Sequence, residues 1–157
     1  MGGAFRLVAL PKERFAAFFA LSEAELRSRG ARRMVVDDKP GYPCRVSLAD
    51  AEIGETVVLL PFMHHDVETP YRAGGPIFVR ERAETATPGV GEVPVMFRHR
   101  LLSLRGYTAE GMMAAAKVSP GAELEAAIAG LFVEREVAYL HVHNAGPGCF
   151  NCRVERM

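Results

Sequence analysis

Tryptophan is absent from this chain of 157 residues, and cysteine and lysine each occur only three times. An odd number of cysteines does not form a closed set of disulfides, so the sequence does not belong to the small disulfide-stapled proteins. A chain of this length does not need such bonds, because it buries roughly 68–70% of its unfolded surface on folding. No apolar run approaches the ~20 residues that a membrane-spanning helix requires. We therefore expect reduced thiols and no membrane partner.

An excess of charge of either sign is also missing. The chain has 19 Lys and Arg residues against 19 Asp and Glu residues, which gives a net charge of zero. Nucleic acids and acidic membrane surfaces select for a basic excess, so we expect neither as a partner. The first residues, MGGAFRLVALPKERF, lack the long apolar core of a signal peptide, which favours a cytoplasmic location. The length favours a single domain over residues 1–157.

Strand-like segments are spread along the whole chain and outnumber the helical ones. They are short, apolar and often β-branched, and turn residues separate several of them. The predicted strands cover residues 4–10, 32–36, 56–62, 77–82 and 100–107, together with VAYLHVHN and CFNCRVERM, which resemble a terminal hairpin around AGPG. Strands and helices do not alternate regularly, so the pattern predicts an α+β fold with a mainly antiparallel sheet.

Two principal helices are predicted. In LSEAELRSRG, Ser22 is the N-cap, Glu25 completes a capping box and Gly30 suits the position after the C-cap. In SPGAELEAAIAGLF, Ser119 is the expected cap and Pro120 the first helical residue. The segment KERFAAFFA places three phenylalanines on one helical face, which we assign to the core.

Four motifs in a fixed order carry a family resemblance. They are PGYPCRVSLADAEIGE (40–55), YRAGGPIFVRE (71–81), RLLSLRGY (100–107) and HVHNAGPGCF (141–150). In this order they resemble the small bacterial family called domain of unknown function 1203, whose members are about as long as this chain. The resemblance implies a bacterial, single-domain protein and supplies no catalytic residue. Cys152 is not part of the resembling pattern.

The polar residues of these motifs lie beside glycine or proline, where turns form. If the turns meet, Arg45, Tyr71 and Arg105 can grip a carboxylate or phosphate, and Asn144 can orient it. The competing interpretation is a buried ion pair of Arg45 or Arg105 with Glu81 that binds no ligand. We favour the first interpretation, which predicts a binding site for a small anionic metabolite.

Cys149 follows a Gly-Pro-Gly turn and suggests a second hypothesis, a cysteine-dependent enzyme. In this hypothesis Cys149 is the nucleophile and His143 the base, and Glu81 or Asn144 orients the imidazole. Free cysteine is more often a small buried hydrophobic residue, which is the competing interpretation. The Met112–Met113 pair is assigned to the core.

A third hypothesis is a zinc site. His141 and His143 alternate on a predicted strand and so point to the same face, and Cys149 and Cys152 can add thiolates. If the two cysteines lie on a strand, however, they face opposite ways. The pair His64–His65 is a second source of ligands, of which at most one should join a site. If the chain binds no ligand at all, the remaining hypothesis is a structural role, for example as a homodimer.

Overall fold

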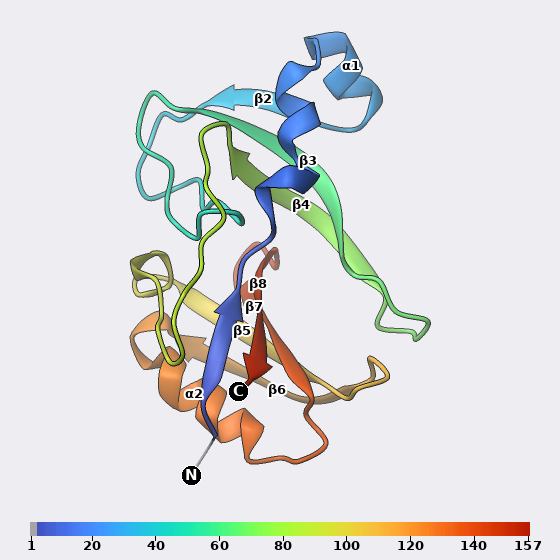
Figure 1. Cartoon of the computed structure of the whole chain (residues 1–157), viewed down its shortest axis with the longest axis vertical. Coiled ribbons are helices and arrows are strands. Elements are labelled where there is room, and N and C mark those ends of the chain that lie inside the picture. The colour runs from blue at the N-terminus through green and yellow to red at the C-terminus, as the bar shows by residue number, and fades with distance from the viewer. Residues whose placement is uncertain (1–2) are drawn as a thin grey trace.

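Two antiparallel sheets form the framework of the protein (Figure 1). The structure is a computed structural model and describes residues 3–157. The five-stranded sheet contains, in spatial order, β1 (Phe5–Val8), β8 (Phe150–Arg156), β7 (Tyr139–Asn144), β5 (Leu101–Tyr107) and β6 (Met113–Pro120). The three-stranded sheet contains β2 (Arg32–Val35), β3 (Thr56–His65) and β4 (Ala73–Arg80). Two α-helices accompany the sheets, so the predicted α+β class is confirmed.

Strand β7 illustrates how the sequence pattern builds the larger sheet. Leu140 and Val142 point to one face, where they join the main hydrophobic core. The intervening residues, Tyr139, His141 and His143, point to the opposite face because side chains alternate along a strand. All six residues of β7 are buried, so both faces of this strand are covered.

Helix α2 (Leu124–Phe132) covers the first of these faces, with Leu124 and Ile128 in the same core as β5 and β7. The prediction that Ser119 caps this helix and that Pro120 is its first residue is wrong. Ser119 and Pro120 instead pair with Leu102 and Leu101 as the end of β6, and the Ser119 hydroxyl donates to a backbone carbonyl. The ladder with β5 therefore extends through the residues that the sequence pattern assigned to a helix cap.

Helix α1 (Glu23–Ser28) has the predicted capping box, in which Ser22 and Glu25 exchange hydrogen bonds of 3.1 and 3.0 Å. Gly30 has a positive φ of 72°, as expected after the helix end. The preceding segment forms two 3-10 turns, Lys12–Arg14 and Ala16–Ala20, rather than one helix with an apolar face. Its phenylalanines still pack in or against the core of the smaller sheet.

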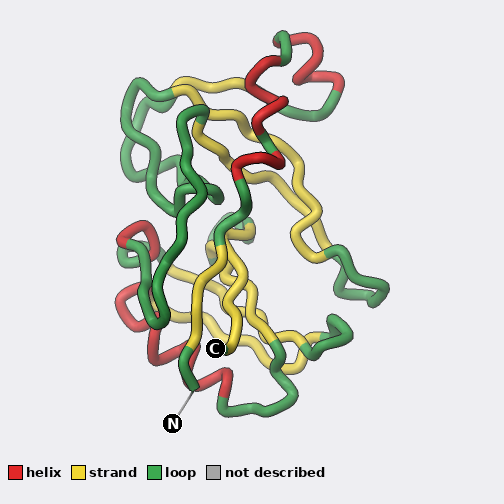
Figure 2. Tube along the Cα trace, viewed as in Figure 1, coloured by secondary structure: helices red, strands yellow, loops and turns green. Residues whose placement is uncertain are grey.

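Strand β3 connects the two sheets through its last residues, of which His65 still pairs with Ala73 of β4. Its last residues, His64 and His65, lie over the second face of β7, where His65 contacts the Tyr139 hydroxyl at 2.6 Å. At the tip of the β3–β4 hairpin, Thr69 donates to the carbonyl of Gly111 in the β5–β6 turn. Helix α1 lies at one end of the molecule and helix α2 near the other (Figure 1 and Figure 2).

The loop between β2 and β3 lies where the two sheets meet. Its residue Arg45 donates its backbone N–H to Phe78 of β4, and its carbonyl accepts from Leu10, which follows β1. The cis peptide bond in this loop precedes Pro40, and the Tyr42–Pro43 bond is not cis. Within residues 3–157, none of the helices is long and apolar enough to cross a membrane.

Candidate functional site

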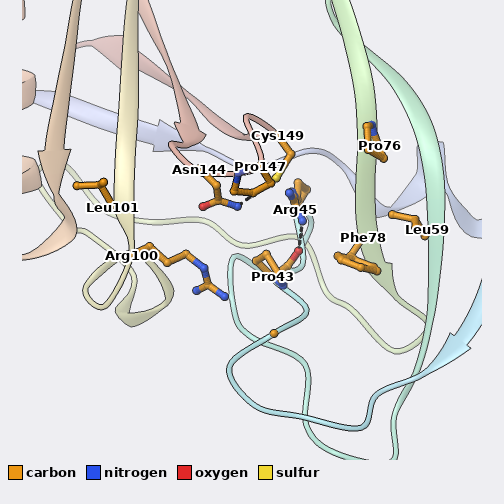
Figure 3. A pocket seen from close by; sticks show the side chains of 12 residues that line it. Pro43, Arg45, Leu59, Pro76, Phe78, Arg100, Leu101, Asn144, Pro147 and Cys149 are labelled. Carbon is orange, nitrogen blue, oxygen red and sulfur yellow. Dashed lines mark hydrogen bonds between the residues drawn. The ribbon is translucent and has the colours of Figure 1, made fainter.

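A cleft of about 620 Å³ opens at the junction of the two sheets (Figure 3). The loop before β3, the strands β3 and β4, the start of β5 and the turn between β7 and β8 all contribute to it. Its apolar wall consists of Pro43, Leu59, Pro76, Phe78, Leu101 and Pro147. Its polar side chains are Arg45, Arg100, Asn144 and Cys149. A mostly apolar cleft with a few polar groups is the usual form of a small-molecule site.

Arg45 is the most unusual residue of the cleft, because its side chain is buried at 1% exposure without an acidic partner among the described residues. Its Nε donates to the carbonyl of Phe150 at 2.7 Å, and its Nη1 donates to the carbonyl of Pro43. These bonds fix the guanidinium in the wall of the cleft, next to the Cys149 sulfur. Burial lowers the pKa of Arg45 from its ordinary value, while contact with Cys149 raises it. A buried charge without a counter-ion is costly, so a bound anion would relieve this position.

Arg100 lies in the same cleft but is already neutralised. Its two terminal nitrogens donate to the two carboxylate oxygens of Asp50, at 2.5 and 3.1 Å. Only 6% of the Asp50 side chain is exposed. This bidentate pair fixes the loop before β3 against the start of β5. The contrast leaves Arg45 as the cleft arginine with an uncompensated charge.

Asn144 and Cys149 form the third side of the cleft, at the two ends of the β7–β8 turn. The Asn144 amide donates to the Cys149 sulfur at 3.2 Å, and its oxygen accepts from Asn151 at 2.8 Å. The second hydrogen bond determines which end of the Asn144 amide faces the sulfur. Cys149 is partly exposed, whereas Cys44 and Cys152 are buried. Of the three thiols, Cys149 is therefore the one that a molecule in the cleft can reach.

The four predicted anion-binding residues do not share one cavity. Arg45 and Asn144 line the cleft, but Tyr71 and Arg105 do not. Tyr71 lies on the β3–β4 connection with 37% exposure, where its carbonyl accepts from His65. Arg105 lies on β5, where it pairs in register with His141 of β7. Nothing in the sequence indicated that Tyr71 and Arg105 would lie outside the cleft that contains Arg45 and Asn144.

The predicted catalytic set of Cys149, His143 and Glu81 is not assembled. His143 uses Nδ1 to bond the carbonyl of Gly148 at 2.9 Å, and its Nε2 is buried without a partner. Glu81 lies at the end of β4 in a different cavity, together with Glu52 and Arg82. Side chains alternate along β7, so His143 lies on the face that carries His141, whereas the next residue lines the cleft beside Cys149. The alternative ion pair of Glu81 with Arg45 or Arg105 is also absent among residues 3–157.

The predicted zinc ligands are likewise divided. Cys152 points into the main core beside α2, and Cys149 faces the cleft. His141 and His143 do share a face, and His64 of β3 approaches them from the other sheet. Ring nitrogens of these three histidines lie within 4.8 Å of one another. The sequence indicates the His64–His65 pair as a source of at most one further ligand, and His64 is the residue that joins the other two histidines. Both ring nitrogens of His65 are hydrogen-bonded instead, to the Tyr71 carbonyl and the Tyr139 hydroxyl.

Sequence comparison is consistent with the motifs. The family described as "Protein of unknown function (DUF1203)" matches residues 41–156, which include all the cleft residues and the three clustered histidines. No curated protein matches this chain. No solved structure matches it either.

Proposed function

We propose that this chain, which belongs to the DUF1203 family, binds a small organic anion in the cleft at the junction of its two sheets. The observation that carries the proposal is the buried guanidinium of Arg45, which lines the cleft and has no acidic partner among the described residues. Planar guanidinium groups bind carboxylates and phosphates through paired hydrogen bonds. Asn144 lies beside the same space, and its amide can donate a further hydrogen bond to an anion.

The wall of the cleft defines the rest of the ligand. Leu59 and Phe78 present hydrocarbon surface on the β3–β4 side of the cleft, and Leu101 adds apolar surface beside Arg100 and Asn144 (Figure 3). Burial of apolar surface contributes roughly 25 cal/mol per Å², so an aromatic or branched aliphatic body adds affinity that a free inorganic ion lacks. The proposed ligand class is therefore a carboxylate or phosphate ester with an apolar body.

A thermal-shift screen of several hundred metabolites tests this proposal. A ligand at a hundred times its dissociation constant should stabilise the protein by about 2.7 kcal/mol. Arg45→Lys keeps the charge but loses the fork of donors, and it should weaken the binding of any anionic hit by at least about tenfold. Arg82→Lys changes an exposed arginine in another cavity and should leave the affinity unchanged.

A second measurement uses only the unaltered chain, so its result does not depend on whether the Arg45 variant folds. An anionic hit should slow the alkylation of Cys149 in the unaltered chain, because both occupy the same cleft. The proposal fails if the hits are neutral molecules, or if anionic hits bind with equal affinity to both variants and leave Cys149 unprotected.

A cysteine-dependent reaction at Cys149 is the second candidate function. It is favoured by the partial exposure of this thiol and by the Asn144 amide, which donates a hydrogen bond to its sulfur. The described residues place no general base next to the sulfur, so an enzyme of this kind would need its substrate to accept the proton. We rank it below anion binding for that reason.

A further inference from the structure

The face of the larger sheet opposite α2 carries a cluster of three histidines. His141 and His143 alternate along β7, and His64 reaches them from β3 of the smaller sheet. We call these residues the trihistidine cluster. One ring nitrogen of each lies within 4.8 Å of the other two. The cluster is distinct from the cleft, and none of its members lines that cavity.

Each member of the trihistidine cluster has a buried ring nitrogen without a hydrogen-bond partner: Nδ1 of His64, Nδ1 of His141 and Nε2 of His143. The neighbouring His65 shows that this is not a general property of the region. Its Nδ1 contacts the Tyr71 carbonyl at 2.8 Å, and its Nε2 contacts the Tyr139 hydroxyl at 2.6 Å. Buried polar atoms are nearly always paired, and an ion is one of the regular explanations for those that are not.

The three imidazoles are neutral at neutral pH and keep a free lone pair. Burial is the main cause and lowers the pKa to about 4 for His64, about 2 for His141 and about 3 for His143. The guanidinium groups of Arg105 and Arg153 act in the same direction, and the Gly148 carbonyl opposes them at His143. Neutral imidazole is the form that coordinates metal ions.

We propose that the trihistidine cluster binds one Zn²⁺ ion through His64, His141 and His143. Imidazole nitrogens suit zinc and its neighbours among the transition metals, whereas magnesium and calcium prefer oxygen ligands, which the cluster does not offer. The bond from Nδ1 of His143 to the Gly148 carbonyl fixes the ring with Nε2 toward the cluster, as is usual for metal-bound histidine.

The geometry requires only a small closure of the rings. Zn–N bonds of about 2.0–2.1 Å place tetrahedral ligands roughly 3.4 Å apart, so nitrogens within 4.8 Å must move slightly inward. Three protein ligands leave one position for water or an anion. Positive groups such as Arg105 surround the cluster, which favours an anion or hydroxide there.

This inference goes beyond anion binding in the cleft and does not depend on it. The ion would connect the two sheets, because His64 belongs to one and the other two ligands belong to the other. It would also fix the β7–β8 turn through the contact of His143 with Gly148, which precedes Cys149.

Zinc titration of the full chain tests the site. The protein is stripped with a chelator, and Zn²⁺ is added in competition with a chromophoric chelator, with Mg²⁺ as the control ion. We expect one Zn²⁺ per chain and no competition from Mg²⁺. His141→Ala and His143→Ala should each weaken Zn²⁺ binding by more than about 100-fold, above the range for loss of an outer hydrogen-bond partner. His99→Ala alters a histidine outside the cluster and should remain within about threefold of the parent.

Cobalt spectroscopy of the unaltered chain provides a test that does not depend on how the variants fold. Co²⁺ in a tetrahedral site with three imidazoles gives intense visible bands, and added Zn²⁺ should abolish them. The proposal is overturned by substoichiometric Zn²⁺ binding, by a weak six-coordinate Co²⁺ spectrum, or by folded His141→Ala and His143→Ala variants that retain Zn²⁺ affinity.

Discussion

Among single residues, charge compensation separates the arginines near the junction. Arg80 is paired with Glu55 and Arg100 with Asp50, each through two nitrogens. Arg45 is more deeply buried than either and contacts only carbonyl groups and the Cys149 sulfur. An arginine kept in this state reduces stability unless something else compensates its charge. An anion bound in the cleft, as proposed, would supply this compensation.

The three cysteines should differ strongly in reactivity. Under native conditions, iodoacetamide should modify Cys149 at least about tenfold faster than Cys44 or Cys152, because Cys149 is partly exposed and the other two thiols are buried, and access controls the rate. Burial raises the pKa of Cys152 far above its ordinary value, which makes this thiol inert. Mass spectrometry of timed digests measures the three rates. Equal rates at all three positions would contradict the exposure that the structure gives to Cys149.

The Arg80–Glu55 pair should make stability depend on pH. Partial burial tends to raise the pKa of Glu55, but hydrogen bonds from Arg80 and from the Glu52 backbone outweigh it, so the pKa lies below the ordinary value of 4.5. The stabilisation is therefore complete above that value and is lost as the pH falls through the lower pKa of the folded state. Glu55→Gln should reduce the free energy of unfolding by about 1 kcal/mol at neutral pH and by much less at about pH 3. Urea titrations of both proteins at the two pH values measure this; a difference that is independent of pH would refute it.

At the level of elements, local chemistry predicted some boundaries well and failed at others. The capping box of Ser22 and Glu25 depends on neighbours three residues apart, so it could be read from the sequence and is confirmed. The start of α2 could not, because the backbone of Ser119 is occupied by pairing with Leu102 of β5. This pairing is a long-range contact that no local pattern contains. The segment KERFAAFFA was also predicted incorrectly, because its helical spacing of phenylalanines indicated one helix and the structure has two 3-10 turns.

The junction between β6 and α2 should depend on a glycine. A Cβ at Gly121 would lie 1.6 Å from the carbonyl oxygen of Phe97, so Gly121→Ala requires the backbone to move. It should lower the free energy of unfolding by about 1–3 kcal/mol. Gly130 is an exposed glycine inside α2, and a Cβ at this position would meet no atom within 4 Å. Gly130→Ala should therefore raise the free energy of unfolding by about 0.5–1 kcal/mol. Denaturant titration compares the two, and the same sign of change in both variants would contradict the packing described for this junction.

On the scale of the whole molecule, the sites arise from the way one sheet is placed on the other. The family, the fold class and the shared face of His141 and His143 were accessible from the sequence, because they depend on motifs and on the alternation of strands. The approach of His64 and the separation of Tyr71 from Arg45 were not, because they depend on how far β3 extends over β7. Sequence spacing does not determine such distances between sheets.

The two sheets should unfold as one unit because buried contacts join them. Tyr139→Phe removes the hydroxyl that contacts His65 across the junction and leaves a buried ring nitrogen unpaired. We expect a loss of about 1–3 kcal/mol in the free energy of unfolding, reported equally by hydrogen exchange in β3 and β7. Tyr71→Phe removes an exposed hydroxyl and should change the free energy by less than about 0.5 kcal/mol. A loss confined to one sheet would show that the sheets are not coupled.

The most direct measurement of the central claim is an NMR titration that observes the Nε–H signal of Arg45. Benzoate combines a carboxylate with an apolar ring, and benzamide has nearly the same shape without the charge. The cleft predicts that benzoate shifts the Arg45 Nε–H signal and the amide signals of Asn144 and Cys149 in a saturable manner, while benzamide does not. Equal shifts with both compounds, or benzoate shifts only at exposed arginines such as Arg82, would contradict the assignment of this cleft as an anion site.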